Sequence, residues 1–239
     1  MNKYANKVLN KAKILVDKGI DMNNFCCEIL LERHGQSIGN EKRIFLGHTD
    51  IDLSELGYKQ AQLCAEAMKD EKIDCIYSSD LIRAYNTAIP HAALRGLTVI
   101  PKKELREFFA GKWENVPVEE LKDKYKNEYL YLWREHFASF SAPHLEVESV
   151  EHLAERIHSQ VLEIARAHIG ERVLIATHAA AIRAFWGKIS GYVGDEASSV
   201  FDFPTNASIS RVGFDGERLI PIIYSDDSML GAQTSRWQG

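Results

Sequence analysis

The sequence is poor in the features that cross-link a protein or anchor it in a membrane. Its four cysteines show no C-x-x-C spacing, so we expect them to be small buried residues in a reducing compartment. No apolar run approaches the roughly 18 residues that a membrane-spanning helix needs, and five lysines among the first 18 residues interrupt any signal-peptide core. These absences predict a cytoplasmic protein without a membrane partner.

The sequence also lacks a surplus of positive charge and the signatures of two large enzyme classes. The net charge is −5, and no cluster of Lys and Arg with interleaved aromatics is present, which predicts no nucleic-acid partner. Ile182 stands where a phosphate-binding loop ending at Gly187 and Lys188 would need its first glycine. No G-x-S-x-G elbow occurs either, so neither a P-loop NTPase nor an α/β-hydrolase is indicated.

Segments of strand and helix type alternate along most of the chain. We expect strands at 26–35, 73–79, 97–105 and 172–178, helices at 54–70, 80–94, 117–137, 149–168 and 179–190, and a terminal hairpin of strands at 207–214 and 218–225. This alternation predicts a three-layer α/β/α sandwich, with a mostly parallel doubly wound sheet and an antiparallel edge. Residues 1–24 are expected to form a helical extension, with a helix at 3–18, and residues 25–239 a single domain.

Polar side chains follow each of the four predicted inner strands. Arg33 and His34 follow the first strand, Arg83 the second, Glu107 the third and His178 the fourth. In an open α/β sheet, ligands bind beyond the carboxyl ends of the strands. We therefore expect two histidines, two arginines and one carboxylate to converge at one edge of the sheet.

A phosphomonoester is the substrate that suits this combination of groups. An imidazole with a pKa of about 6.5 is mostly neutral at pH 7 and is a competent nucleophile. Two guanidinium groups offset the charge of the phosphate with paired N–H donors, and the second histidine can hydrogen-bond the transferring group. A carboxylic acid supplies the proton that the leaving oxygen needs.

Several stretches, in this order, resemble the motifs of the histidine phosphatase superfamily, branch 1, across residues 26–226. "LLERHGQSIGN" resembles its Arg-His-Gly signature, "IYSSDLIRAYNTA" the segment with the second arginine, "LREFFAGKWEN" the loop with the proton donor, and "IATHAAAIR" the second-histidine motif. The resemblance implies the phosphoglycerate mutase-like fold for the catalytic domain, and it implies no metal and no organic cofactor.

The resemblance also implies a role for each matching residue. His34 is the residue phosphorylated during turnover, and Glu107 is the acid that later serves as the base for water. His178 completes the catalytic set. The phosphate-binding residues are Arg33, Asn40, Arg83 and, through its backbone N–H, Ala179.

Two departures from the family pattern concern the size of the substrate rather than catalysis. Family loops commonly read Trp-Glu-Gly where this chain has Asn115 in third place, and commonly carry two glycines where Ala179 and Ala180 stand. Alanine keeps the backbone N–H but leaves less room. Only 35 residues separate Trp113 from Ser149, and "PHLEVES" keeps Glu148 and Ser149, which is similar to the phosphatases of the family.

The function expected is that of a phosphatase hydrolysing small phosphomonoesters through a phosphohistidine. The first alternative is a 2,3-bisphosphoglycerate-dependent phosphoglycerate mutase, which uses the same residues. The second is a non-catalytic phosphate-binding module on this fold. The expected partner is a small phosphorylated metabolite, and a homodimer is slightly favoured over a monomer.

Other polar and aromatic residues have less specific interpretations. His48, Asp50 and Asp52 alternate in a polar loop, where capping of the coming helix is favoured over a metal. Taken alone, His34 is also consistent with an ordinary loop histidine and Arg33 with a surface ion pair to Glu32, but the accompanying motifs favour the functional role. Glu32, on the other face of the strand, is assigned no role. The tyrosines and tryptophan of 117–137 are interpreted as a partial lid over the substrate.

Overall fold

The computed structural model describes residues 25–132, 137–191 and 201–235. The helix expected at 3–18 lies outside the described residues. No helix in the described part of the chain is both long and apolar enough to cross a bilayer.

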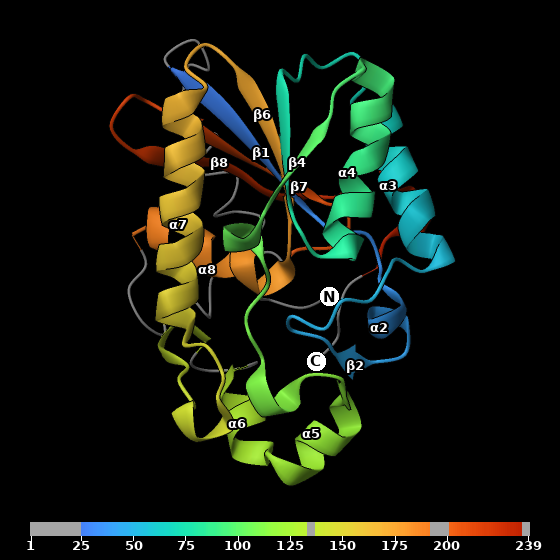
Figure 1. The fold of residues 1–239 in the computed structure, drawn as a ribbon, viewed down its shortest axis with the longest axis vertical. Helices are drawn as coiled ribbons and strands as arrows, with labels where there is room; N and C mark the ends of the chain where they lie inside the picture. Colours follow the sequence, from blue (N-terminus) through green and yellow to red (C-terminus); the bar gives the residue numbers. More distant parts are fainter. Residues whose placement is uncertain (1–24, 133–136, 192–200, 236–239) are drawn as a thin grey trace, which may run out of the picture.

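In these described ranges, six strands form one mixed sheet at the centre of the molecule (Figure 1). They are β1 (Cys27–Arg33), β3 (Cys75–Ser79), β4 (Val99–Lys102), β6 (Arg172–Thr177), β7 (Ile209–Phe214) and β8 (Leu219–Asp226). The order is β4-β3-β6-β1-β7-β8. The first four strands in this order are mutually parallel, β7 runs antiparallel to β1, and β8 runs antiparallel to β7. The predicted fold class is confirmed, including the antiparallel edge.

Four helices cover the two faces of this sheet. Figure 1 shows α3 (Glu55–Ala67) and α4 (Ile82–Arg95) on one face, and α7 (Val150–Ala167) and α8 (Ala179–Ile189) on the other. Strand β1 is buried on both faces: Leu30 packs in the cluster under α3 and α4, while Ile29 and Leu31 pack in the cluster under α7 and α8. Alternate side chains of a strand point to opposite faces, so one apolar run fills two cores.

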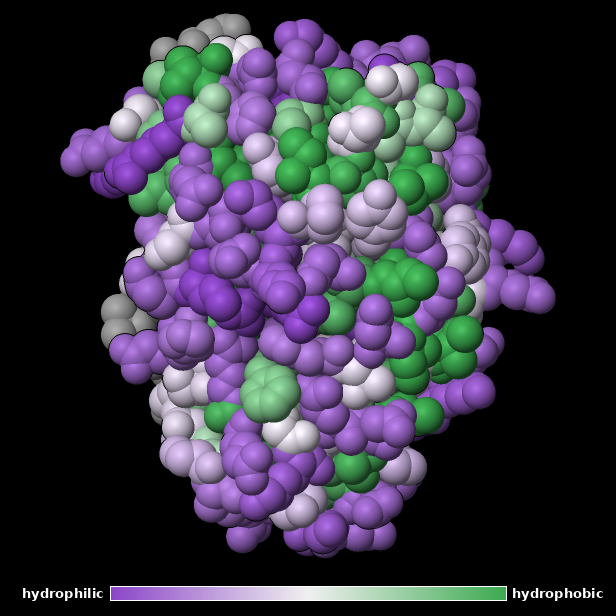
Figure 2. Space-filling model, in the orientation of Figure 1, coloured by the Kyte–Doolittle hydropathy of each residue, from purple (hydrophilic) through white to green (hydrophobic). Residues whose placement is uncertain are grey.

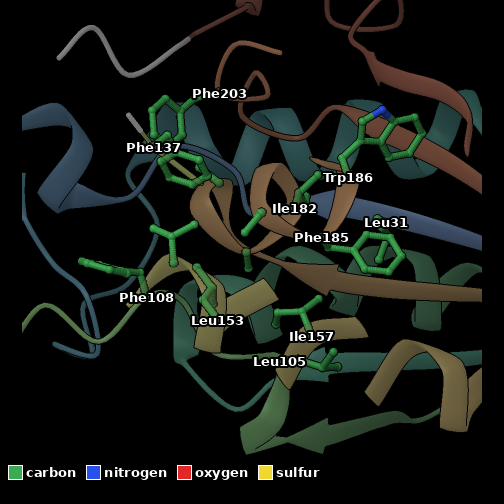
Figure 3. Close-up of a cluster of buried hydrophobic side chains, with 14 of the residues drawn as sticks. Leu31, Leu105, Phe108, Phe137, Leu153, Ile157, Ile182, Phe185, Trp186 and Phe203 are labelled. Carbon is green, nitrogen blue, oxygen red and sulfur yellow. The ribbon is translucent and has the colours of Figure 1, made fainter. Parts of the chain in front are cut away.

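The larger of these two cores extends to the carboxyl end of the sheet. Figure 3 shows its side chains gathered from the sheet, α7 and α8, with Phe108, Phe137 and Phe203 at one end of the cluster. The outer surface in the view of Figure 2 is mostly hydrophilic, with small hydrophobic patches between the polar residues. Burial of the apolar stripe of α7, from Leu153 to Ile164, agrees with the periodicity read from the sequence.

The helix starts follow the sequence in two cases and depart from it in a third. Ser54 and Ser149 cap α3 and α7 with their hydroxyl groups, as predicted. The expectation that Asp50 and Asp52 cap the coming helix α3 was wrong. Asp50 Oδ1 instead accepts from the backbone N–H of Ile82, 2.7 Å away at the start of α4, because Leu81 offers that helix no capping side chain.

The segment after Trp113 forms two short helices instead of the single helix predicted at 117–137. Helix α5 (Val118–Lys124) and helix α6 (Lys126–Leu130) are separated at Tyr125, whose backbone (φ −127°, ψ 43°) is not helical. Its ring packs against Trp113 with centroids 6.1 Å apart. Helical periodicity therefore predicted that this segment is helical, but it did not predict the break at Tyr125. The break coincides with the packing of Tyr125 on Trp113.

Smaller elements surround the carboxyl end of the sheet. They are the helix α2 (Ile38–Glu41), the two-stranded sheet of β2 (Ile44–Phe45) and β5 (Val116–Pro117), and the single 3-10 turns η2 (Lys103–Leu105), η3 (Gly111–Trp113), η5 (Phe137–Ser139), η6 (Pro143–Leu145) and η7 (Gly231–Gln233). The sequence had indicated only loops in most of these places, since elements of two to four residues carry too few positions for a periodic pattern.

The alternative of a surface ion pair between Glu32 and Arg33, which the sequence motifs did not favour, is excluded. Both residues are buried, with 0% and 1% of their surface exposed. They are consecutive on β1, so their side chains leave the strand on opposite faces of the sheet. Arg33 belongs to the polar site described next, and Glu32 lies among apolar side chains on the face covered by α3 and α4.

Candidate active site

A pocket opens beyond the carboxyl ends of the parallel strands. Six of the seven residues expected at the site line it: Arg33, His34, Asn40, Arg83, Glu107 and Ala179. The seventh, His178, lies beside His34, with ring centroids 5.2 Å apart and ring planes at 59°. The structure thus brings together all the residues that the sequence had placed after different strands.

The side chain of His34 is oriented by a hydrogen bond to the carbonyl group of the next residue. Its Nδ1 lies 2.7 Å from the carbonyl oxygen of Gly35, so Nδ1 carries the proton and donates it, and Nε2 keeps its lone pair. Burial, together with the nearby guanidinium groups of Arg83 and Arg33, lowers the pKa of His34 well below its ordinary value. The ring is therefore neutral at pH 7, and Nε2 keeps a lone pair that no proton occupies.

Gly35 permits the close packing that fixes this loop. A Cβ on Gly35 would lie 2.4 Å from the carbonyl oxygen of Gly57, at the start of α3, so no larger residue fits without displacing that helix. The N–H of Gly35 donates to Thr87 Oγ1 on α4, 3.0 Å away. The backbone beside His34 is thus held by α3 and α4.

Backbone carbonyl oxygens accept hydrogen bonds from both arginines. Arg83 donates from Nη1 to Thr49 (2.9 Å) and from Nη2 to Gly47 (2.7 Å), and Arg33 donates from Nη1 to Pro204 (2.6 Å). Burial lowers the pKa of Arg83 to about 10, which still leaves it charged at pH 7. Two buried guanidinium groups lining one pocket make it attractive to an anion.

His178 and the start of α8 add further donors. His178 is the N-cap residue of α8 and is fully buried, and neither ring nitrogen has a hydrogen-bond partner in the described part of the chain. Burial and the charge of Arg83 lower its pKa well below the ordinary value. Ala179 begins α8, where backbone N–H groups and the helix dipole favour negative charge.

Asn40 is placed by two contacts to its side-chain oxygen. Oδ1 accepts from the backbone N–H of Ser37 (3.2 Å) in a capping box at the start of α2, and from Nδ2 of Asn206 (3.3 Å). These contacts leave the Nδ2 group of Asn40 as a donor. Asn206 also donates to the carbonyl oxygen of His34 (3.0 Å), so it ties the two residues together.

The carboxylate of Glu107 caps the other side of the pocket. Its oxygens accept the backbone N–H groups of Phe108 (2.9 Å), Ala180 (3.1 Å) and Ala181 (3.0 Å). The side chain therefore reaches from the loop after η2 to the first turn of α8. These three hydrogen bonds hold the carboxyl group of Glu107 at the wall of the pocket that His34 also lines.

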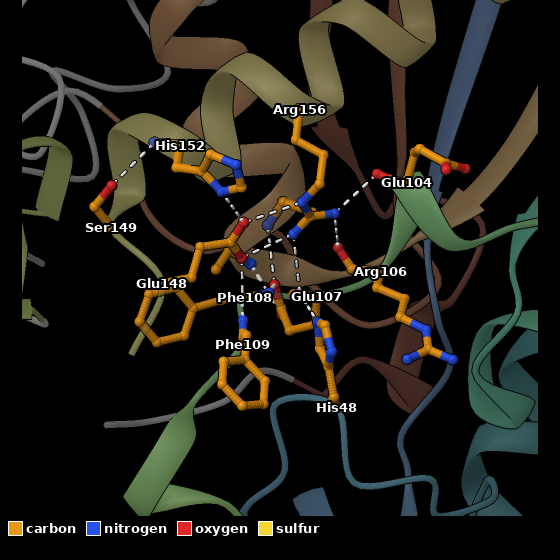
Figure 4. Close-up of polar contacts among 12 residues, drawn as sticks. His48, Glu104, Arg106, Glu107, Phe108, Phe109, Glu148, Ser149, His152 and Arg156 are labelled. Carbon is orange, nitrogen blue, oxygen red and sulfur yellow. Dashed lines mark hydrogen bonds and ion pairs between the residues drawn. The ribbon is translucent and has the colours of Figure 1, made fainter. Parts of the chain in front are cut away.

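Arg156 on α7 holds the loop that carries Glu107 (Figure 4). Its guanidinium group donates to the carbonyl oxygens of Glu104 (2.8 Å), Arg106 (3.0 Å) and Glu107 (3.3 Å). It also forms a paired contact with the carboxylate of Glu148, at 3.0 and 2.8 Å. A planar fork with five N–H donors is suited to this many acceptors, which a lysine could not match.

We expect Arg156→Ala to lower kcat by about 10- to 100-fold with little change in KM, because Arg156 positions the Glu107 loop and touches no substrate. The loss should be larger for alkyl phosphates than for p-nitrophenyl phosphate, whose leaving group needs no proton. Arg156→Lys should restore only part of the rate. Steady-state kinetics with both substrates checks this, with exposed Arg166→Ala on the same helix as the control. Equal losses for both substrates would contradict it.

Three positioning residues were missed by sequence reasoning. Thr87 lies four residues after Arg83 on α4 and accepts from the N–H of Gly35, and Asn206 lies in the loop before β7 and donates to the carbonyl oxygen of His34. Neither residue was assigned a contact with this loop from the sequence. Arg156 was one of many charged residues on an amphipathic helix. For that residue the only signal was the similarity around Glu148, its partner.

The rest of the pocket wall is apolar. The described lining residues beyond the polar set include Ile44, Phe45, Leu46, Phe108, Leu132, Phe137 and Phe203. Behind two of them, the guanidinium carbon of Arg183 lies 4.3 Å from the ring centroid of Phe137 and 4.4 Å from that of Phe203. Of the aromatic residues predicted to form a partial lid, Tyr125 and Tyr129 pack against the core or in it, and Trp133 lies outside the described residues. From the same segment, Leu132 and Phe137 line the pocket instead.

Comparisons with known proteins agree with this geometry. A family model described as the histidine phosphatase superfamily (branch 1) matches residues 29–226. The chain is 31% identical to phosphoserine phosphatase 1 of Hydrogenobacter thermophilus, over 85% of this chain and 94% of that protein. It is 31% identical to a phosphoglycerate mutase of Schizosaccharomyces pombe, over 70% and 82%. A solved mycobacterial glucosyl-3-phosphoglycerate phosphatase with VO3 is 26% identical, with a TM-score of 0.75 over 84% of this chain and 99% of that one.

Proposed function

The chain belongs to the histidine phosphatase superfamily, branch 1, and we propose that it hydrolyses small phosphomonoesters at this pocket through a phosphohistidine on His34. The observation that carries the proposal is the contact of His34 Nδ1 with the Gly35 carbonyl oxygen, because it leaves Nε2 as a neutral nucleophile between two arginines. The enzyme is a phosphoric monoester hydrolase of this family. We further propose that residues 25–239 form its single catalytic domain.

In the first step Nε2 of His34 attacks phosphorus, and the bond from phosphorus to the ester oxygen breaks. The carboxyl group of Glu107 gives its proton to the departing oxygen, so the leaving group departs as an alcohol. Arg33, Arg83 and His178 hydrogen-bond the three equatorial oxygens, where charge develops in the transition state. The product of this step is the alcohol and a phosphohistidine.

In the second step water attacks the phosphohistidine. The carboxylate of Glu107 takes a proton from the water, the bond from phosphorus to Nε2 breaks, and inorganic phosphate leaves. The enzyme returns to its starting state, with His34 neutral and Glu107 protonated. The first step uses the substrate and residues of this chain, and the second step uses these residues and one water molecule.

The low pKa of His34 has a consequence for the pH profile. The reactive form is the neutral ring, and the folded protein lowers the pKa, so the neutral form persists as the pH falls through 6.5 and is lost only well below it. In a plot of kcat/KM against pH, we therefore expect the fall caused by protonation of His34 to lie well below pH 6.5. Titration of His34 by ¹³C NMR, against free histidine, checks the assignment; a midpoint at or above 6.5 would be incompatible with it.

Hydrolysis is favoured over mutase activity by the charges of the pocket. A mutase must hold a carboxylate and a second phosphate besides the transferring group. Among the described lining residues, the cations are Arg33 and Arg83, and both face the transferring phosphate in this mechanism. The remaining apolar wall suits a leaving group with apolar surface.

A substrate panel with and without 2,3-bisphosphoglycerate tests the function. It includes phosphoserine, 3-phosphoglycerate, glucosyl-3-phosphoglycerate, nucleoside monophosphates and aryl phosphates. We expect phosphate release from at least one of them without the bisphosphate. Interconversion of 2- and 3-phosphoglycerate that depends on the bisphosphate would favour a mutase, and phosphate binding without any turnover would favour a non-catalytic module.

A further inference from the structure

Three side chains that commonly bind metals meet in the layer between the sheet and its helices, outside the active-site pocket. Glu32 comes from β1, Cys64 from α3 and His91 from α4, and each is 0% exposed. One ligand atom from each residue lies within 4.8 Å of the other two. Nε2 of His91 is 3.2 Å from Oε2 of Glu32.

The surroundings do not compensate these polar groups. Both carboxylate oxygens of Glu32 and both ring nitrogens of His91 are buried without a hydrogen-bond partner among the described residues, apart from the weak S–H donor of Cys64 beside the carboxylate. Their neighbours are apolar, including Leu30 and Met68. A buried carboxylate whose polar neighbours are one thiol and one imidazole is unfavourable unless a positive charge lies beside it, so these three groups at one point suit a bound cation.

We propose that Glu32, Cys64 and His91 bind one Zn²⁺ ion. Ligand distances of about 2.0–2.3 Å at tetrahedral angles place ligand atoms about 3.3–3.6 Å apart, close to the 3.2 Å found between His91 Nε2 and Glu32 Oε2. A thiolate and a carboxylate carry two negative charges, which Zn²⁺ neutralises. Imidazole and thiolate ligands select Zn²⁺ over Mg²⁺ or Ca²⁺, and a water molecule completes the tetrahedron.

Zinc binding here requires the Cys64 thiol to lose its proton. Burial and the nearby carboxylate raise the pKa of that thiol, so the apo protein holds it protonated. Binding therefore releases one proton to solvent as the Zn–S bond forms. No electron is transferred, and no oxidant or reductant is involved.

The position of the site gives it a structural role. Glu32 directly precedes Arg33, and His91 lies two turns after Arg83 on α4, with Thr87 between them. The metal would join β1, α3 and α4, the three elements that fix the backbone beside His34. It does not border the pocket, so it takes no part in the phosphoryl transfer and does not depend on the proposed function.

The test is metal binding by the full chain, purified without an immobilised-metal column. We expect about one zinc per chain by elemental analysis, or uptake of one equivalent after dialysis against EDTA. Free zinc about 1,000-fold above the dissociation constant should raise Tm by about 10 °C. Co²⁺ in its place should give a thiolate-to-cobalt absorption band in the near ultraviolet, with visible bands of tetrahedral intensity.

Variants separate this site from others. Cys64→Ala should lose the thiolate band and His91→Leu the stoichiometric binding, while Cys75→Ala, a partly buried cysteine outside the cluster, should keep both. If a variant fails to fold, the cobalt spectrum of the unmodified chain still decides. The proposal is overturned by the absence of stoichiometric metal and of the thiolate band, or by a band that Cys64→Ala retains; a proton shared between Glu32 and His91 would then neutralise the pair.

Discussion

Replacement of His34 by alanine is expected to lower kcat by at least about 10,000-fold. In the proposed mechanism Nε2 of His34 forms the bond to phosphorus, and no other neutral imidazole replaces it. His178 lies beside it, yet its ring centroid is 5.2 Å away and its orientation is set by α8. Loss of a nucleophile in other covalent enzymes has effects of this order or larger.

The decisive measurement combines turnover with trapping of the intermediate. Rapid mixing with a ³²P-labelled phosphomonoester, followed by an alkaline quench, should trap a label on the unmodified protein that is stable in alkali and lost in acid. His34→Ala should show no such label. The control is His144→Ala, an exposed histidine outside the pocket. An acid-labile phosphoenzyme in His34→Ala would show that another residue is the nucleophile.

The second large effect is expected for Glu107→Gln, with kcat reduced by about 100- to 10,000-fold for alkyl phosphates. The amide occupies the same volume but cannot donate the proton to an alkoxide. Its single oxygen keeps the bond from Ala180 or the bond from Ala181, which reach different oxygens of Glu107, and the other bond is lost. For p-nitrophenyl phosphate, whose leaving group is stable as an anion, the first step should be nearly unaffected.

This difference between substrates distinguishes proton donation from a general loss of structure. Burst kinetics with p-nitrophenyl phosphate should show normal phosphorylation of Glu107→Gln and slow release of phosphate, because Glu107 also serves as the base for water. Glu104→Gln, an exposed glutamate in the same loop, is the control. Equal losses in the first step for both leaving groups would assign Glu107 a structural role only.

The sequence could predict the sheet and the principal site residues for the same physical reason. Leu30 and Leu31 belong to an apolar run that only a strand buried on both faces satisfies, and the carboxyl ends of parallel strands meet at one edge. Arg33, Arg83 and His178 all come at or after the carboxyl ends of strands predicted to be parallel, so the sequence placed them at the same end of the sheet. No side-chain geometry was needed for this step.

Other parts of the structure depend on contacts that no local pattern records. The break at Tyr125 accompanies packing on Trp113, and Asp50 caps a helix that begins 32 residues later in the sequence. Asn206 and Arg156 act on the site through backbone carbonyl oxygens, to which most residue types could donate. Glu32 is the clearest case, since a glutamate at the end of a strand gives no sign of being fully buried.

The contact of Glu107 with the first turn of α8 links acid–base chemistry to backbone dynamics. In the proposed mechanism, the carboxylate that accepts from Ala180 and Ala181 is the group that gains and loses a proton in each catalytic cycle. When it is protonated, it accepts these N–H groups less strongly, so the first turn of α8 should open more often. The hydrogen-exchange rates of the Ala180 and Ala181 amides would then report the protonation state of Glu107.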